Sequence, residues 1–446
     1  MTNVGFPFLI LKTNYKMKRT TITTLLFLVT FFHFASAQTT FKIEVTNTLN
    51  KNRTDVPIVI KLGNLKQNQA KRVLWQSALI TDTRNNNDTI PNQLDDIDQD
   101  GIADELAFTS DMKAGETKQF KIVLSKDNPA IQYKPRTFAE LMLRNPKIKE
   151  KNKQDIYLQE LFFNPETKDP YHIVHHHGIA FESELIALRI YFDERQTLDL
   201  YGKSNKQLEL KETQFYTTQE QKLQNNYGDD ILWVGNTFGF GAFRGWNGEK
   251  STMISDVKSR GQRIIAKGPV RTIVEIVDRG WKPMGSPQRI NTTIRYTLWN
   301  GHRDIQVDVL FPYELGNYTE TKDLLFSTGL INVKGSKEYS NNNGLRGLWG
   351  TDWPVSLKDS VGHKKETVGM GIYIPNKYLV RELPANKDDY GFVISTSSKC
   401  LSYYLTYSSD NETFGYHSAN SWFDYLSLWE DELKHPLTIK VKPSKI

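Results

Sequence analysis

Hydrophobic side chains alternate with polar ones along most of this chain, and this pattern restricts the fold more than any other feature. Near the amino end, Phe41, Ile43 and Val45 alternate with polar residues. The same spacing recurs in Glu184–Phe192 and Ile290–Leu298. Successive side chains of a β-strand point to opposite faces of its sheet, so a period of two predicts strands with one buried face. We therefore expect an all-β protein, with no long helix.

The alternating segments fall into two groups, which we interpret as two domains. Residues 38–126 contain short strands separated by turns, as is typical of a small β-sandwich. Residues 127–154 include a polar, lysine-rich stretch and are interpreted as a linker. Residues 155–446 contain longer strands and the hairpin signal Asn300-Gly301. This second group predicts a large antiparallel supersandwich, in which two wide sheets pack face to face.

The first 37 residues have the pattern of a secretory signal peptide. Lys18 and Arg19 precede the apolar run Leu25–Phe34, and Ala35-Ser36-Ala37 supplies the small residues of a cleavage site. We expect cleavage after Ala37 and export, to the periplasm or beyond the cell. Gln38 follows the site where a lipid anchor would need Cys, and no later stretch is apolar enough to cross a membrane.

Charge and cysteine content limit the classes of binding partner and the interactions that can stabilise the fold. The chain has 57 basic and 51 acidic side chains, and four of the basic ones lie in the leader, so the mature part is nearly neutral. A nucleic-acid partner is not expected, because binding of that kind needs a strong excess of basic charge. Cys400 is the single cysteine, which excludes an intrachain disulfide and a multi-cysteine metal site. The hydrophobic core must therefore hold the fold together.

An acidic segment near residue 100 resembles the first half of a calcium-binding loop. Its carboxylates recur at alternate positions and a glycine follows them, which suits a hard cation that needs several oxygen ligands around a sharp turn. The twelfth position is Ala107 rather than Glu, so the segment is not an EF-hand. We expect a structural calcium ion and no cofactor for catalysis, the alternative being a solvated acidic turn. The predicted ligands are Asp96, Asp98, Asp100 and Asp104.

Four of the nine histidines lie within six residues, at His172 and His175–His177, directly before Gly178. Imidazole transfers protons near neutral pH and binds metals. Gly178 permits a sharp turn, as where a loop meets a strand. We interpret the cluster as part of a functional site, the alternative being a polar surface cluster.

Downstream residues supply further groups that suit a sugar ligand. The stretch 239–246 is glycine-rich but lacks the spacing of a nucleotide-binding loop. Arginine there suits a carboxylate or sulfate, and tryptophan suits stacking on a sugar ring. The candidate residues of this region are Arg189, Tyr227, Asp229, Arg244 and Trp246.

Four segments together resemble a known family: residues 176–185, 191–193, 199–203 and 227–230. It is an exported bacterial family of unknown function that is encoded in polysaccharide-degradation loci and includes the ulvan oligosaccharide dehydratase. The resemblance implies a supersandwich similar to that of galactose mutarotases and polysaccharide lyases. It also implies a carbon–oxygen lyase whose partner is an acidic oligosaccharide. The reaction would remove water across C4–C5 of a uronic acid at the non-reducing end and leave the 4,5-unsaturated sugar.

Such a dehydration needs three kinds of group. A base removes H5, an acid protonates the departing C4 hydroxyl, and a cation neutralises the sugar carboxylate so that the enediolate can form. We predict His176, His177 and Tyr227 as the catalytic groups. The predicted substrate-binding residues are His175, Arg189, Asp229, Arg244 and Trp246.

Four alternatives remain open at this point. A zinc ion held by histidine could replace arginine as the neutraliser. The protein could instead be a non-catalytic glycan-binding protein, a sugar epimerase or mutarotase, or a polysaccharide lyase.

Overall fold

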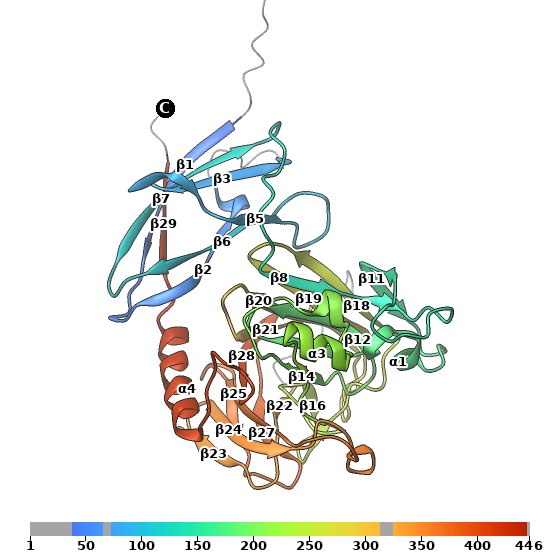
Figure 1. Ribbon diagram of the computed structural model, residues 1–446. Helices are drawn as coiled ribbons and strands as arrows, with labels where there is room; N and C mark the ends of the chain where they lie inside the picture. The colour runs from blue at the N-terminus through green and yellow to red at the C-terminus, as the bar shows by residue number, and fades with distance from the viewer. Residues whose placement is uncertain (1–37, 66–72, 313–323, 444–446) are drawn as a thin grey trace, which may run out of the picture. The chain divides into compact units, whose positions relative to one another are not determined.

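Antiparallel strands dominate the computed structural model, which describes residues 38–65, 73–312 and 324–443 (Figure 1). The predicted signal peptide, residues 1–37, lies outside the described residues. The neighbouring strands of each sheet run antiparallel, as in the pairs β1–β7 and β19–β20. The predicted all-β class is therefore confirmed.

The first part of the chain forms a two-sheet sandwich. Alternate residues such as Ile43, Ile58 and Phe120 face inward and are completely buried in a single hydrophobic cluster. One sheet has the order β29-β1-β7-β3-β4 and the other β2-β6-β5. The bounds are β1 (Gln38–Thr46), β2 (Arg53–Lys61), β3 (Ser77–Asp82), β4 (Asn85–Thr89), β5 (Asn92–Asp95), β6 (Glu105–Met112), β7 (Thr117–Ser125) and β29 (Thr438–Pro443), with the short 3-10 turn η1 (Leu62–Asn64).

The structure differs from the expected boundaries at two places. The last strand, β29, pairs along β1 from Phe41↔Pro443 to Thr46↔Thr438, so the sandwich includes the carboxyl end of the chain. The expected linker 127–154 contains β8 (Thr137–Glu140) and β9 (Met142–Leu143), and β8 joins a sheet of the second part. Paired strands can be far apart in the sequence, so the order of alternating segments along the chain does not show which strands pair.

The second part is built on a nine-stranded sheet with the order β11-β18-β19-β20-β21-β28-β25-β24-β23. The predicted hairpin at Asn300-Gly301 joins β20 to β21, and Gly301 takes the positive φ of 71° that this turn requires. The bounds are β11 (Glu160–Phe163), β18 (Ser259–Lys267), β19 (Arg271–Trp281), β20 (Ile290–Trp299), β21 (Asp304–Leu310), β23 (Lys337–Ser340), β24 (Leu345–Asp352), β25 (Glu366–Tyr373) and β28 (Cys400–Ser409).

Two five-stranded sheets, β15-β14-β13-β12-β8 and β17-β16-β22-β27-β26, form the opposite layer. Inward residues of all three sheets, among them Leu188, Ile294 and Leu330, belong to one hydrophobic cluster, which gives the expected supersandwich. The bounds are β12 (Gly178–Ser183), β13 (Ala187–Tyr191), β14 (Leu198–Gly202), β15 (Asp229–Asp230), β16 (Arg244–Trp246), β17 (Ser251–Thr252), β22 (Phe326–Ile331), β26 (Leu379–Glu382) and β27 (Asp389–Ile394), with β9 paired to β10 (Ile156–Tyr157).

One long helix, α4 (Ala419–Lys434), corrects the expectation that there would be none. Trp422, Leu426 and Trp429 form its buried face and pack with Leu345 and Tyr373 of the nine-stranded sheet, beside β24 and β25 (Figure 1). No helix among the described residues is long and apolar enough to span a membrane. The remaining helical segments are α1 (Pro170–Ile173), η3 (His175–His177), α2 (Leu210–Thr213), α3 (Gln219–Asn225) and η5 (Leu357–Asp359).

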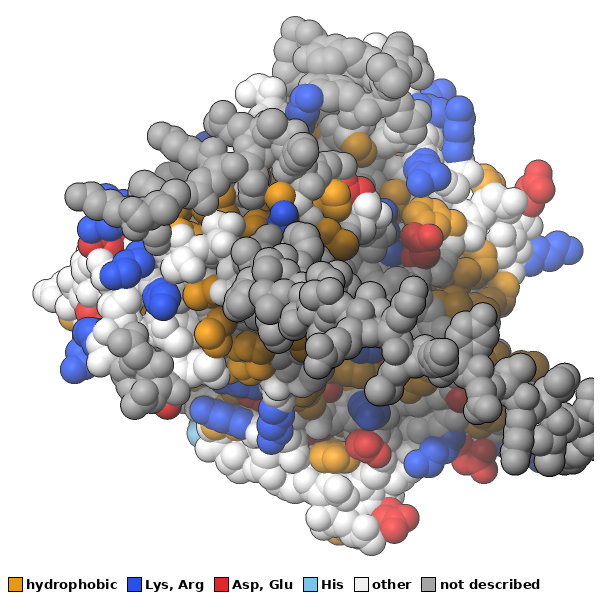
Figure 2. Space-filling model, turned by 90° about the horizontal axis from the view of Figure 1, so that it is seen from above, with side chains coloured by type: hydrophobic (Ala, Val, Ile, Leu, Met, Phe, Trp, Pro, Cys, Tyr) orange, Lys and Arg blue, Asp and Glu red, His pale blue; other side chains and the backbone are white. Residues whose placement is uncertain are grey.

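Charged side chains of both signs are mixed among the described residues that are visible on one face of the molecule. On the face shown in Figure 2, Lys and Arg side chains are spread around the molecule and interspersed with Asp and Glu. This distribution accords with the near-neutral charge of the part of the chain that follows the leader.

Candidate active site

Strands β13 and β14 carry a charged cluster on the outer face of their sheet. Leu188 and Ile190 point into the core, so Arg189 between them points outward. Asp199 on β14 is the direct cross-strand partner of Arg189. The register of the two strands therefore brings a guanidinium and a carboxylate together.

The Arg189 side chain makes several short contacts within this cluster. Its Nε and Nη2 donate to Asp199 Oδ2 at 2.9 and 2.6 Å, and Nη2 also donates to Asp230 Oδ2 at 3.0 Å. Burial is the strongest influence on the pKa of Arg189 and would lower it, but Asp199, Tyr191 and Asp230 together outweigh burial and raise it. Burial and Asp199 together raise the pKa of Asp230 well above its usual range. Asp199 is thus the carboxylate that makes the shortest contacts with Arg189 in this cluster.

The three histidines of η3 enter β12 through a strained turn. His176 and His177 both have positive φ values, 37° and 70°. That conformation is unfavourable for residues with a Cβ and concentrates at functional sites. A Cβ on the next residue, Gly178, would lie 1.8 Å from the carbonyl oxygen of Ile190. Only glycine therefore lets the strand begin so close to β13.

His177 is held in one tautomer against Tyr171. The two rings stack with centroids 3.9 Å apart and an angle of 5° between their planes. His177 Nδ1 lies 3.1 Å from the backbone oxygen of Tyr171, which can only accept a hydrogen bond, so Nδ1 carries the proton and Nε2 the lone pair. Burial, with Arg189 nearby, lowers the pKa of His177 to about 4. His177 is therefore a neutral imidazole at pH 7, with a lone pair on Nε2.

His175 and His176 are more deeply enclosed. The His176 side chain has no solvent exposure, and its Nε2 lies 3.1 Å from Glu140 Oε1. Burial lowers the pKa of His176 and raises that of Glu140, which favours a neutral pair. Burial also lowers the pKa of His175 to about 4. His175 Nε2, His176 Nδ1 and Glu140 Oε2 have no hydrogen-bond partner. His176 therefore does not line the surface, unlike the half-buried His177.

A cleft of about 510 Å³ lies beside Tyr171, the residue that stacks on His177, although His177 and Arg189 are not among its lining residues. Tyr171, His172 and Arg195 are among its lining residues. The Arg195 guanidinium lies 4.9 Å from the ring centroid of Tyr171 and 4.7 Å from that of Tyr191. It pairs with Asp193 and its side chain is 19% exposed. Arg195 is thus a cation that a ligand in the cleft can reach.

The structure gives the remaining predicted residues, the catalytic candidate Tyr227 and three substrate-binding candidates, neighbours other than His177. Tyr227 follows α3, and its pKa is raised by burial and by Glu212, with no histidine among the groups that act on it. Asp229 is paired with Lys222. Arg244 and Trp246 lie on β16, in the neighbouring five-stranded sheet.

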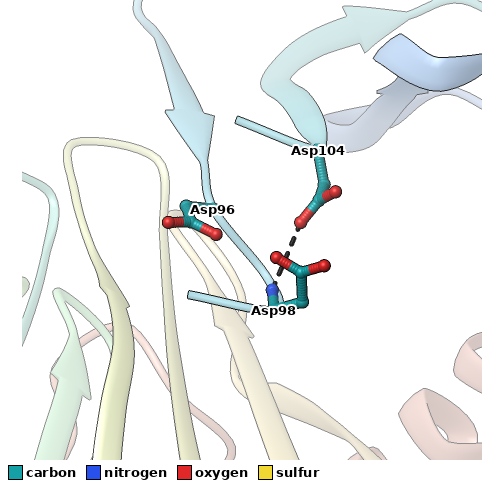
Figure 3. A group of neighbouring side chains, drawn as sticks. All are labelled: Asp96, Asp98 and Asp104. Carbon is teal, nitrogen blue, oxygen red and sulfur yellow. Dashed lines mark hydrogen bonds between the residues drawn. The ribbon is translucent and has the colours of Figure 1, made fainter. Parts of the chain in front are cut away.

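The acidic loop brings three of its four predicted ligands together. Carboxylate oxygens of Asp96, Asp98 and Asp104 lie within 4.8 Å of one another, and Figure 3 shows them gathered at one turn. Asp100 stands outside this group, although its backbone N–H donates to Asp96 Oδ1 at 3.1 Å. Within the described ranges, this is the group of three or more His, Cys, Asp or Glu side chains that converges closely enough for a metal. The histidines of η3 do not form such a group of three in the part of the chain that the structure describes.

Sequence reasoning missed several residues of the site. Tyr171 lies in the short helix α1, and Arg195 and Tyr216, whose ring lies 5.7 Å from that of His175, come from loops; the strand pattern places none of them, and Glu140 lies in the expected linker. One signal was present for Tyr191. It stands two residues after Arg189 on β13, so it shares the outer face, and its hydroxyl donates to Asp199 Oδ2 at 2.7 Å.

Comparison with known proteins identifies the family. Residues 45–439 match the family model described as "Domain of unknown function (DUF4861)". The chain belongs to this family. The resemblance to a family of unknown function is thereby confirmed in its coarse form, and the DUF4861 description names no activity. No curated protein matches the chain.

Solved structures resemble this DUF4861 protein only distantly. One is a protein in glycosyl hydrolase family 38 from Enterococcus faecalis, with a TM-score of 0.45 and 9% identity over 90% of this chain and 47% of that one. Another is an alpha-mannosidase from Enterococcus faecalis V583, with a TM-score of 0.42 and 8% identity over 90% of this chain and 46% of that one. The chain thus spans about half the length of these structures, and a likeness this distant bears on neither chemistry nor substrate.

Proposed function

We propose that this DUF4861 protein is a carbon–oxygen lyase that dehydrates the non-reducing-end uronic acid of an acidic oligosaccharide. The observation that carries the proposal is His177. It is a neutral imidazole whose Nε2 lone pair is available, because Nδ1 binds the Tyr171 carbonyl. A phenol and two guanidinium groups lie around it, at Tyr171, Arg189 and Arg195.

The reaction asks for this set of groups. H5 of a uronic acid is weakly acidic because the adjacent carboxylate is negative, so a cation must neutralise that carboxylate before the enediolate can form. A base with a pKa below neutral is fully available at pH 7. The C4 hydroxyl leaves as water only if an acid protonates it.

Each role fits one residue. His177 Nε2 removes H5, and the electron pair of the C5–H bond forms the C4=C5 double bond as the C4–O bond breaks. Tyr171 gives its proton to the departing hydroxyl, which leaves as water, and the phenolate then recovers a proton from His177 through solvent. Burial raises the pKa of Tyr171, although Arg189 and Arg195 oppose it, so the phenol keeps its proton near neutral pH. We assign Tyr171 rather than Tyr227 because its ring stacks on His177.

The arginines divide the remaining work. Arg195 is partly exposed in the cleft and is the group we assign to the sugar carboxylate. Arg189 is 6% exposed and already bound to Asp199 and Asp230, so its role is to position the site and favour the neutral form of His177.

The test is incubation of the purified protein with oligosaccharides that end in a saturated uronic acid. Dehydration creates the ultraviolet absorbance of a conjugated enol-ether acid and lowers the product mass by one water. A polysaccharide lyase would instead cleave the chain, an epimerase would leave the mass unchanged, and a binding protein would change neither signal. Any of these three results would contradict the proposal.

A substitution locates the chemistry. His177→Asn keeps approximate size but removes the titratable lone pair, so turnover should fall by roughly 10²–10⁴. The matched control is His363→Asn, because His363 lies in an exposed turn. Wild-type turnover in a folded His177→Asn protein would remove His177 from the mechanism.

A further inference from the structure

Strand β16 presents two polar side chains on the outer face of the second layer. A Cβ on Gly245 would lie 3.1 Å from the ring of Trp281, which belongs to the core, so Gly245 faces inward. Its neighbours Arg244 and Trp246 therefore face outward. Arg189 faces outward from the other five-stranded sheet of the same layer. Arg189, Arg244 and Trp246 therefore all lie on the outer surface of that layer.

Both outward residues hold a buried donor without an acceptor. Arg244 is 4% exposed. Its Nη2 donates to the backbone oxygens of Asn236, at 3.2 Å, and Thr237. Its Nε has no partner, and neither has the indole Nε1 of Trp246. Buried N–H groups are almost always hydrogen-bonded, because a buried N–H that loses its bond to water without gaining another partner destabilises the folded state. Two unpaired donors at alternate positions of one strand point to an acceptor that a ligand supplies.

The charges around these donors favour an anion. The Arg381 guanidinium lies 5.6 Å from the ring centroid of Trp246. Burial lowers the pKa of Arg244 to about 10, which leaves it cationic at neutral pH. Asp389 is the acid that acts on Arg244 most strongly; burial raises its pKa to about 6, so at pH 7 it is still mainly ionised and offsets part of the Arg244 charge, while Arg381 adds a second cation. Arg195 in the cleft also acts on Arg244, so this patch lies within electrostatic reach of the candidate active site.

We propose that Arg244 and Trp246 form a second subsite, which binds an anionic group on the sugar next to the reacting uronic acid. The group is a carboxylate or a sulfate ester, since both present oxygen acceptors to a guanidinium and an indole N–H. The inference rests on the proposed function for its substrate class. It adds that the preferred oligosaccharide carries a second negative charge.

The test uses Trp246→Phe, which keeps an aromatic ring but removes the five-membered ring of the indole together with its unpaired N–H donor. Trp233→Phe is the matched control, because Trp233 is 49% exposed and stands outside the subsite. Both changes are made in the His177→Asn protein so that no turnover disturbs binding. Calorimetry then measures the Kd of three disaccharides with a uronic acid at the non-reducing end. The second sugar is neutral in one, sulfated in another and a second uronic acid in the third.

We expect Trp246→Phe to raise the Kd of the sulfated or the diuronic disaccharide by about tenfold or more. The Kd of the neutral disaccharide should not change. Which of the two is weakened identifies the anion. Arg244→Lys, which lacks Nε–H, should weaken the same disaccharide.

Unchanged affinity for both anionic disaccharides would overturn the subsite. This result is separate from the fate of the proposed function. If the wild-type protein dehydrates nothing but Trp246→Phe still weakens an anionic disaccharide, the lyase proposal fails and the subsite stands.

Discussion

At the scale of single residues, the site depends on histidines that the fold keeps neutral. His175 and His177 have pKa values of about 4 in the folded protein, because burial and neighbouring cations disfavour the charged ring. In the unfolded chain they titrate near 6.5. Between these values the unfolded state binds more protons than the folded state, so stability must fall as the pH falls.

The resulting prediction is a stability profile. Above pH 6.5 these histidines should not lower the free energy of unfolding. Between pH 6.5 and pH 4 the free energy of unfolding should decline, and the part of this loss that is due to His177 should be on the order of 3 kcal/mol at most. Urea unfolding of the wild type and of His177→Asn at a series of pH values measures this. The difference between the two should narrow as the pH falls, while His363→Asn follows the wild type. Parallel profiles for His177→Asn and wild type would mean that the His177 ring is not held neutral by the fold.

At the scale of elements, the acidic loop and α4 each carry a prediction. The loop is ordered by its own carboxylates: Gly101 N–H donates to Asp96 and Ile97 N–H donates to Asp104 at 2.8 Å. We propose that calcium occupies the convergent site of Asp96, Asp98 and Asp104. An ion that binds only the folded state stabilises it, by about 2.7 kcal/mol at a hundredfold excess over Kd.

Chelation should therefore lower the melting temperature, and added calcium should restore it. Asp98→Asn should remove this response, whereas Asp424→Asn, on the exposed side of α4, should keep it. Equal melting curves with and without chelator would leave the loop as a solvated acidic turn.

Substitutions in helix α4 measure how much its packing on the nine-stranded sheet stabilises the fold. Leu426 is completely buried against that sheet, while Leu428 on the same helix is 47% exposed. Leu426→Ala should cost about 2–5 kcal/mol in the free energy of unfolding, because it removes buried methyl groups and leaves a cavity. Leu428→Ala should change it by less than about 0.5 kcal/mol. Equal costs in denaturant unfolding would mean that α4 is not docked as described.

At the scale of the whole molecule, the last strand of the chain pairs with the first. Strand β29 follows α4 and completes the sheet that begins with β1, and Ile439 packs against the core of the sandwich. Removal of residues 436–446 should leave β1 as an unpaired edge and expose part of that core. We expect a lower melting temperature and binding of a hydrophobic dye. A chain that lacks only residues 444–446 should match the full chain, and if the longer deletion did so too, β29 would not be needed for the sandwich.

Alternation by itself determined the fold class, because the period of two is a property of each strand alone. It identified β1, β2, β7, β13, β20 and β21 and the turn at Gly301, each of which depends on residues close together in the chain. The same local reasoning singled out the histidines, Arg189 and the acidic loop. It did not find α4, although Ser418 caps its first turn and three buried residues follow the spacing of a helix.

Tertiary structure decided what these local signals could not. Glu140 meets His176 only because β8 pairs with β12, and Tyr171 stacks on His177 only because α1 folds back onto η3. Tyr227 and His176 have suitable chemistry in the sequence, yet Glu212 rather than a histidine is the first charged group that acts on Tyr227, and His176 is enclosed. Burial, partner and tautomer depend on contacts between segments that are distant along the chain. Residue type gives the chemistry that is available, and packing decides which residues a substrate can reach and in which protonation state.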